Sequence, residues 1–237
     1  MLINYHKEIG ESMQDVINRF KKEYNLYSKE KVAFAGRLDP IAFGRIKLIT
    51  GDDLKFKDEM CEQNKIYTYT VLESFQTDTY DILGLITHLN EKYDEKLFEN
   101  PIIFDQPYPS FSSKTVNIDG KMMRLWNAKK SGKLNESIEI PTKKVTIFYN
   151  RIIKREEITG DELFNLIKNR IDKVKGDFRQ KETLELWKTK LNLINSNNFK
   201  LNYYETMISS GGYVRSIANS MGGVAFDIFR KEYINNI

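Results

Sequence analysis

The chain has 237 residues, of which 41% are hydrophobic, so it is long and apolar enough for one large domain or two small ones. Its formal net charge of +4 is small and identifies no class of partner by itself. The single cysteine, Cys61, excludes an internal disulfide framework and a cysteine-cluster metal site, and His6 and His88 are too few for a multi-histidine metal centre. We therefore expect any chemistry to depend on carboxylates, tyrosines, arginines and lysines.

The sequence predicts no targeting or membrane segment. Residues 1–10 lack a basic start followed by a long apolar run, and no apolar stretch approaches about 18 residues. We expect a soluble, intracellular protein located in the cytoplasm.

The first part of the chain predicts a helix followed by strands. Apolar side chains recur at helical spacing over residues 12–24, where Ser12 is placed to cap the helix and Asp15 to complete a capping box. A short apolar segment follows at 46–49. Residues 66–72 alternate aromatic and β-branched side chains, which is typical of a strand.

The middle of the chain is dominated by predicted strands. A polar turn over 76–84 leads into a strand-like segment, 85–89. The pair Asp119-Gly120 predicts a hairpin turn within 112–123, because both residue types accept the left-handed backbone that such turns need. Two further strands are predicted, over 145–153 and 202–208.

The remaining segments predict helices. Apolar residues at helical spacing indicate a helix over 161–174, and the charged stretch after it is expected to be helical over 184–193. We interpret 156–200 as a helical insertion, and a last helix is predicted over 213–221. No repeat, low-complexity tract or linker interrupts the chain, so we interpret 1–237 as a single domain.

The turn Gly36-Arg37-Leu38-Asp39-Pro40 presents one carboxylate between two apolar segments. Loops held by rigid elements are where proteins place groups that act on a ligand, so Asp39 is a candidate nucleophile. The alternative is that Asp39 only hydrogen-bonds its own turn, as Asp beside Pro commonly does. The turn alone does not decide between these interpretations.

Positive charge is concentrated in residues 111–155, which we call the basic sector. It contains eleven basic and three acidic residues, and this net charge of +8 exceeds the +4 of the whole chain. Aromatic residues, among them Trp126, are interleaved with the charge. Such a pattern suits a phosphate backbone with bases to stack on and favours a nucleic-acid partner; the alternative is a solvated basic face.

Five separated motifs occur in one order along the chain. They are GRLDP (36–40), KIY (65–67), TDTYDILG (77–84), PSFSSK (109–114) with Gly120-Lys121, and SGGYVRS (210–216). In order and approximate spacing they resemble the TruB-type tRNA pseudouridine synthases, from about Leu2 to about Lys231 with a break at the insertion. One such motif has a high false-positive rate, whereas five in register are specific.

The resemblance implies an α+β fold, that is, a mixed α/β domain with a curved, largely antiparallel sheet, flanking helices and an RNA-binding cleft. It also implies an isomerase that converts uridine to pseudouridine in the T loop of tRNA, at its position 55. In this family an Asp in the turn attacks the target uridine, and the base is detached, rotated and rejoined to the ribose through carbon. No cofactor and no metal take part. Asp39 matches this nucleophile.

The resemblance also implies roles for four other residues. Tyr67 matches the tyrosine that stacks on the flipped base and takes its C5 proton, although packing in a strand is its alternative role. Tyr213 and Arg215 match the pair that packs under the uridine and forms an ion pair with Asp39, whose carboxylate an arginine fork would orient. Asp81 matches a residue in polar contact with neighbouring nucleotides.

Lys114 and Lys121 fall in the hairpin with which the family grips RNA, or are solvated turn charges. Two residues depart from the family pattern. The family has a small residue where Arg37 stands, so it is open whether Arg37 or Arg215 pairs with the nucleophile. Phe34 replaces a family histidine and either wedges between bases or packs in the core.

The sequence stops shortly after the resembling part, so we expect no carboxy-terminal RNA-binding domain of the PUA type. We expect a monomer that binds the T arm of tRNA through the basic sector, with no membrane partner. Two other functions stay open: a pseudouridine synthase for another RNA site, and an RNA-binding or RNA-folding protein that has the scaffold without the chemistry.

Overall fold

The computed structural model describes residues 1–134, 138–194 and 198–235. Its helices are α1 (Met13–Glu23), α2 (Lys57–Cys61), α3 (Leu125–Lys130), α4 (Gly160–Ile171), α5 (Gln180–Leu193) and α6 (Val214–Ser220), with the 3₁₀ helices η1 (Asn25–Tyr27) and η2 (Gly51–Phe56). Its strands are β1 (Leu2–Lys7), β2 (Val32–Ala35), β3 (Phe43–Thr50), β4 (Asn64–Glu73), β5 (Phe75–Thr77), β6 (Ile86–Leu89), β7 (Ile102–Pro107), β8 (Thr115–Ile118), β9 (Lys121–Arg124), β10 (Thr142–Thr159), β11 (Asn198–Ile208) and β12 (Gly223–Ile234). Within these described ranges, no helix is both long and apolar enough to cross a membrane.

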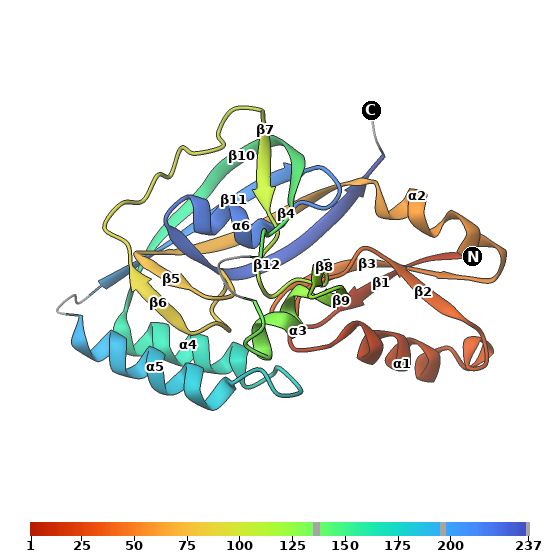
Figure 1. Cartoon of the computed structure of the whole chain (residues 1–237), viewed down its shortest axis with the longest axis horizontal. Helices are drawn as coiled ribbons and strands as arrows, with labels where there is room; N and C mark the ends of the chain where they lie inside the picture. The colour runs from red at the N-terminus through yellow and green to blue at the C-terminus, as the bar shows by residue number, and fades with distance from the viewer. Residues whose placement is uncertain (135–137, 195–197, 236–237) are drawn as a thin grey trace.

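Most strands join one sheet. In the described part of the chain it has eight strands, in the order β1-β3-β12-β4-β11-β10-β7, with β2 paired to β3. The pairs are antiparallel except for β3 and β12, which run parallel where Gly44 pairs with Arg230. β12 and β4 cross the centre of the molecule, between the amino-terminal strands and the β10–β11 pair (Figure 1). This architecture confirms the predicted α+β class with a largely antiparallel sheet.

Helix α1 packs against the amino-terminal strands. The Ser12 hydroxyl accepts the Asp15 N–H at 3.1 Å, and the Asp15 carboxylate accepts the Ser12 N–H at 2.8 Å, so the predicted capping box is confirmed. The apolar face of α1 forms one core cluster with β3, which includes Val16, Phe20 and Leu48.

Helices α4, α5 and α6 cover the central strands. α4 and α5 lie together at one end of the long axis, with α1 toward the other (Figure 1). The buried residues of α4 and α5, including Ile167 and Trp187, join Leu72 of β4 in one core cluster. α6 belongs to a second cluster, which contains Tyr67 and other alternate residues of β4. β4 therefore contributes to two cores, as the alternation of a strand requires.

Local signals predicted the hairpin correctly, whereas five strands of the described chain are absent from the sequence prediction. β8 and β9 are joined by Asp119 and Gly120, whose φ angles of 51° and 78° fit a two-residue turn with both central residues left-handed. The strands not predicted are β1, β2, β5, β7 and β12, and β5 overlaps the start of the segment predicted as a turn. In β12 the residues 223–226 are all buried, because alternate side chains enter two different core clusters on opposite faces of the sheet, so no period-two alternation marks it.

The segment predicted as a helical insertion, 156–200, is helical only in its middle. α4 and α5 occupy that middle, whereas its two ends are the end of β10 and the start of β11, which pair as far as Thr159 and Asn198. Residues 195–197 lie outside the described residues. The two helices therefore extend from the end of a long strand pair.

Gly44 provides a test of the parallel contact between β3 and β12. Its φ is +111°, and an added Cβ would lie 2.5 Å from the Arg230 carbonyl oxygen. We expect Gly44→Ala to lower the free energy of unfolding by about 2–4 kcal/mol, because backbone strain and atomic overlap must both be relieved. Urea denaturation followed by circular dichroism measures this change.

Gly132→Ala is the matched control. Gly132 also has a positive φ, +69°, but an added Cβ would meet nothing within 4 Å. It should cost only about 1 kcal/mol, the strain of the left-handed backbone alone. Equal losses at both positions would contradict the close approach at Gly44.

Candidate active site

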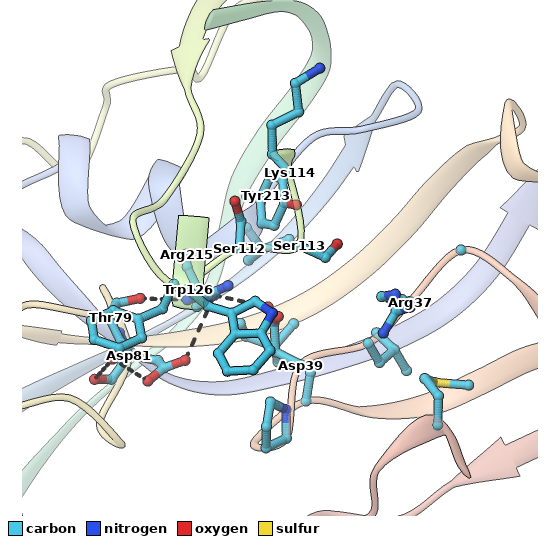
Figure 2. A pocket seen from close by; sticks show the side chains of 18 of the residues that line it. Arg37, Asp39, Thr79, Asp81, Ser112, Ser113, Lys114, Trp126, Tyr213 and Arg215 are labelled. Carbon is cyan, nitrogen blue, oxygen red and sulfur yellow. Dashed lines mark hydrogen bonds and ion pairs between the residues drawn. The ribbon is translucent and has the colours of Figure 1, made fainter. Parts of the chain in front are cut away.

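A cavity of about 860 Å³ opens at the turn that carries Asp39. Segments far apart in the chain line it: the Asp39 turn, β4, residues 79–83 and 108–114, α3, the α4–α5 loop and residues 210–215. Figure 2 shows how the labelled side chains lie around it. All five motifs quoted above contribute lining residues, so the fold collects them at one place.

A buried lysine holds one side of the Asp39 turn. The Lys7 ammonium donates hydrogen bonds to the carbonyl oxygens of Pro40 at 3.2 Å and Ala42 at 2.6 Å. Lys7 is 0% exposed. Burial lowers the pKa of Lys7 to about 8, although the charge of Asp39 acts in the opposite direction.

A buried arginine holds the other side of the same turn. The Arg230 guanidinium donates to the carbonyl oxygens of Gly36 and Arg37, both at 3.3 Å, and to that of Arg45 at 2.8 Å. Arg230 comes from β12 and Arg45 from β3, so the guanidinium joins the turn to the central sheet. The turn is thus fixed through its backbone, and its carboxylate remains available for another partner.

That partner is Arg215. Its Nε donates to Oδ2 of Asp39 at 2.8 Å and lies 3.7 Å from Oδ2 of Asp81, while its Nη1 donates to the Thr79 carbonyl oxygen at 2.6 Å. The Arg215 side chain is 2% exposed, whereas that of Asp39 is 32% exposed. Figure 2 shows the guanidinium between the two carboxylates. The Asp39 carboxylate is thus held on one side and accessible on the other.

Burial and charge act against each other at this ion pair. Burial alone would lower the pKa of Arg215, but the carboxylates of Asp39 and Asp81 outweigh it and keep that pKa above its usual value. Burial raises the pKa of Asp81 to about 6, although the Arg215 charge favours the ionised form. Arg215 is therefore a permanent cation, and Asp81 is the neighbour whose charge changes near neutral pH.

Two tyrosines form apolar walls of the cavity. Tyr67 lies on β4 and is 6% exposed. Tyr213 precedes α6, donates its backbone N–H to the Gln106 side chain at 2.7 Å, and meets Tyr108 edge to face at 6.0 Å between ring centroids. Burial, together with the charge of Asp39, raises the pKa of Tyr213 to about 12. Tyr213 is therefore neutral at physiological pH.

Eight of the nine residues singled out in the sequence line the cavity; these are Phe34, Arg37, Asp39, Tyr67, Asp81, Lys114, Tyr213 and Arg215. The ninth, Lys121, lies on β9 and is exposed outside the lining. The roles given to these residues stay predictions.

The question of which arginine pairs with Asp39 has a geometric answer. Arg215 pairs with it, whereas the Arg37 guanidinium lies over the Phe34 ring, 5.5 Å from its centroid. Arg37 lies on the far side of Asp39 from Arg215 (Figure 2). Phe34 is half-buried at the cavity edge, in contact with this guanidinium.

Sequence reasoning did not find the residues that position the turn and the tyrosine wall. Lys7, Thr79 and Gln106 act through buried hydrogen bonds to atoms distant in the chain. A lysine near the amino terminus looks like an exposed charge, so no local signal distinguishes it. Arg230 lies in β12, outside the five motifs, and its contacts with the turn likewise join segments distant in the chain.

The sequence model of one family matches residues 22–178, which is more than half of the chain. Its description is TruB family pseudouridylate synthase, N-terminal domain. The chain belongs to this family. The matched range includes Asp39, Tyr67 and Asp81, while Tyr213 and Arg215 lie beyond it.

Individual relatives agree with this assignment. The chain is 32% identical over 162 residues to tRNA pseudouridine synthase B of Malacoplasma penetrans, covering 65% of this chain and 66% of the relative. It is 31% identical over 160 residues to the protein of the same name from Caldanaerobacter subterraneus, covering 65% of this chain and 53% of that one. The match thus spans between about half and two thirds of the length of these relatives.

The fold is also similar to that of a solved structure. In the crystal structure of a Cbf5-Nop10-Gar1 complex, one chain matches 98% of this chain, over 48% of its own length, with a TM-score of 0.51. The sequence identity is 13%, so this likeness concerns the fold alone.

The shared cation provides a test of the site's electrostatics. We expect Arg215→Met to lower the free energy of unfolding by about 3–5 kcal/mol at about pH 8, because Asp81 is then buried as an unpaired charge. The loss should be smaller near pH 5, because the pKa of Asp81, about 6 in the presence of the Arg215 charge, rises further without that charge and the carboxyl group takes up a proton. Urea denaturation at both pH values measures this loss.

The double variant Arg215→Met/Asp81→Asn is the control. Its loss in the free energy of unfolding should be the same at both pH values, because it lacks the Asp81 carboxyl group. An equal loss at both pH values in the single variant would contradict this account.

Buried lysines predict a second pH dependence. Burial lowers the pKa values of Lys7 and Lys65 to about 8 in the folded protein, while the unfolded chain keeps the ordinary value of 10.5. Above about pH 8 the unfolded chain therefore binds more protons than the folded protein, so the free energy of unfolding should rise with pH. Denaturation between about pH 7.5 and 9.5 measures this slope, and Lys7→Met should reduce it by about half. If the free energy of unfolding of Lys7→Met rises with pH as steeply as that of the wild type, Lys7 does not contribute to this pH dependence.

Proposed function

We propose that this chain is a pseudouridine synthase that isomerises uridine in RNA, with Asp39 as the nucleophile. The observation that carries the proposal is the Asp39 carboxylate at the cavity, hydrogen-bonded by the buried Arg215 on one side and accessible on the other. Membership of the TruB family supports the reaction class. A carboxylate that is oriented and shielded in this way can act covalently without a cofactor.

The proposed reaction rearranges bonds within one nucleotide. A carboxylate oxygen of Asp39 bonds to the ribose carbon as the bond between that carbon and N1 of the base breaks. The detached base rotates, and the bond to Asp39 breaks as the ribose carbon forms its new bond to C5. C5 releases its hydrogen as a proton, and N1 gains a proton. Nothing is oxidised or reduced, so no further reactant is required.

The cavity walls suit a flipped base. Extruding a base from its stack costs a few kcal/mol, and new stacking surfaces offset that cost. Tyr67 and Tyr213 supply such surfaces next to Asp39. We propose that Tyr67 stacks on the uracil and takes the C5 proton, and that Tyr213 supports the uridine from below.

We propose the T loop of tRNA as the substrate. Two relatives that the chain matches bear the name tRNA pseudouridine synthase B. The side chains of Lys114, Arg124 and Lys130 line the cavity and come from the basic sector, where they suit the phosphates of a folded RNA arm.

Asp39→Ala tests the nucleophile. We expect pseudouridine formation in tRNA to fall by at least about a thousandfold, since removal of a nucleophile leaves only the contributions of binding and orientation. Site-resolved mapping of pseudouridine in tRNA and other RNAs, after incubation with each protein, measures the product.

Asp52→Ala is the matched control, because Asp52 is an exposed aspartate outside the cavity lining. It should leave the rate unchanged. If the wild-type protein binds RNA but forms no pseudouridine in any RNA, the proposal that it is an enzyme is refuted. Product confined to sites outside the T loop would refute only the assigned substrate.

A further inference from the structure

Two large aromatic side chains are partly exposed at the cavity and have no part in the proposed reaction. Trp126 on α3 and Phe178 in the α4–α5 loop, residues 172–179, are each 40% exposed, and both line the cavity. Aromatic rings in such positions present flat apolar surfaces to a ligand. A flat partner would remove that surface from water.

The α4–α5 loop presents Phe178 from a braced backbone. The Gln180 side chain donates to the carbonyl oxygens of Val174 at 2.9 Å and Gly176 at 2.7 Å, and it accepts the Phe178 N–H at 2.9 Å. The Phe178 ring lies against Gly176, where an added Cβ would meet it at 3.3 Å. The loop therefore loses little conformational freedom when a ligand binds.

Two ion pairs join this loop to other walls of the cavity. The Arg179 guanidinium pairs with both carboxylate oxygens of Asp78, at 2.8 and 3.1 Å, and lies 4.9 Å from the centroid of the Phe111 ring. Asp177 accepts from the Lys130 ammonium at 2.6 Å. Lys130 lies on α3, the helix that also carries Trp126. The two rings are therefore supported on linked elements.

The charge of the cavity selects among flat ligands. Among the described residues that line it, nine are Lys or Arg and four are Asp or Glu. Three of the basic residues, Arg124, Lys130 and Arg179, lie in or beside the elements that carry the two rings. A base attached to a phosphate backbone gains from both features, since stacking and phosphate attraction act together in RNA binding.

We propose that Trp126 and Phe178 form a stacking site for an unpaired RNA base other than the uridine that is isomerised. This proposal rests on the function proposed above, because it takes the ligand to be the same RNA. It assigns the α4–α5 loop a role in substrate binding: the loop supplies one of the two rings and ties it to α3.

The test measures binding of a T-arm hairpin RNA to protein that carries Asp39→Ala, so that the RNA stays unmodified. We expect Phe178→Ala and Trp126→Ala each to weaken binding by about 5- to 100-fold, the range for loss of one base–aromatic stack. Phe178→Trp and Trp126→Phe should bind normally, because they keep a ring. Phe178→Leu should bind weakly, because it keeps apolar bulk without a ring.

Phe56→Ala is the matched control. Phe56 is 42% exposed and lies outside the cavity lining, so its loss should not change the affinity. Thermal unfolding of each variant verifies that the fold is intact, which the exposure of both rings leads us to expect. Affinities that are equal in Phe178→Ala, Trp126→Ala and Phe56→Ala, or normal binding by Phe178→Leu, would overturn the proposal.

Tryptophan fluorescence gives an independent readout. The chain has two tryptophans, and Trp187 is 0% exposed, so quenching by added RNA should come from Trp126. The quenching should disappear in Trp126→Phe. RNA that binds the parent protein without quenching its fluorescence would also overturn the stacking site.

The two proposals fail separately. A wild-type protein that forms no pseudouridine, but whose RNA binding depends on both rings, overturns the function and supports the stacking site. Pseudouridine formation combined with ring-independent binding overturns the stacking site alone.

Discussion

The arrangement of the site depends on one buried guanidinium. Arg215 is almost fully enclosed, and an enclosed cation without partners would destabilise the fold strongly. Its partners come from two other places in the chain, the turn that carries Asp39 and the loop that carries Thr79 and Asp81. Folding can bury Arg215 only if these segments meet. The orientation of the Asp39 carboxylate is therefore a by-product of a requirement for stability.

Two more buried cations act on the same turn in a different way. Lys7 and Arg230 donate to backbone carbonyl oxygens, as Pro40 and Gly36 illustrate. Carbonyl oxygens are obligatory acceptors, so this support does not use the acceptor capacity of the Asp39 carboxylate. The turn is held firmly while the group that would react keeps one open side. Rigidity and availability, which usually conflict, are thus assigned to different atoms of one short segment.

The sequence was informative where neighbouring residues decide the structure. Ser12 with Asp15, and Asp119 with Gly120, each contain enough local chemistry to define a cap or a turn. β12 could not be identified in this way, because it lacks period-two alternation and because a charged residue, Asp227, interrupts its apolar run. The charge is tolerated since Arg170 of α4 donates to it at 2.7 Å. The same limit applies to the site: five motifs indicated which residues to consider, but only packing separates Arg215 from Arg37 as the partner of Asp39.

The parallel contact between β3 and β12 also has a consequence for how the protein is made. It joins Gly44 to Arg230, so the Asp39 turn receives its guanidinium from a strand that leaves the ribosome almost 200 residues later. Pairings between such distant segments form slowly and late. A nascent chain that displays the turn before β12 has emerged therefore lacks the Arg230 guanidinium that holds the Gly36 and Arg37 carbonyl oxygens. The Asp39 carboxylate takes its fixed position only after nearly the whole chain has been synthesised.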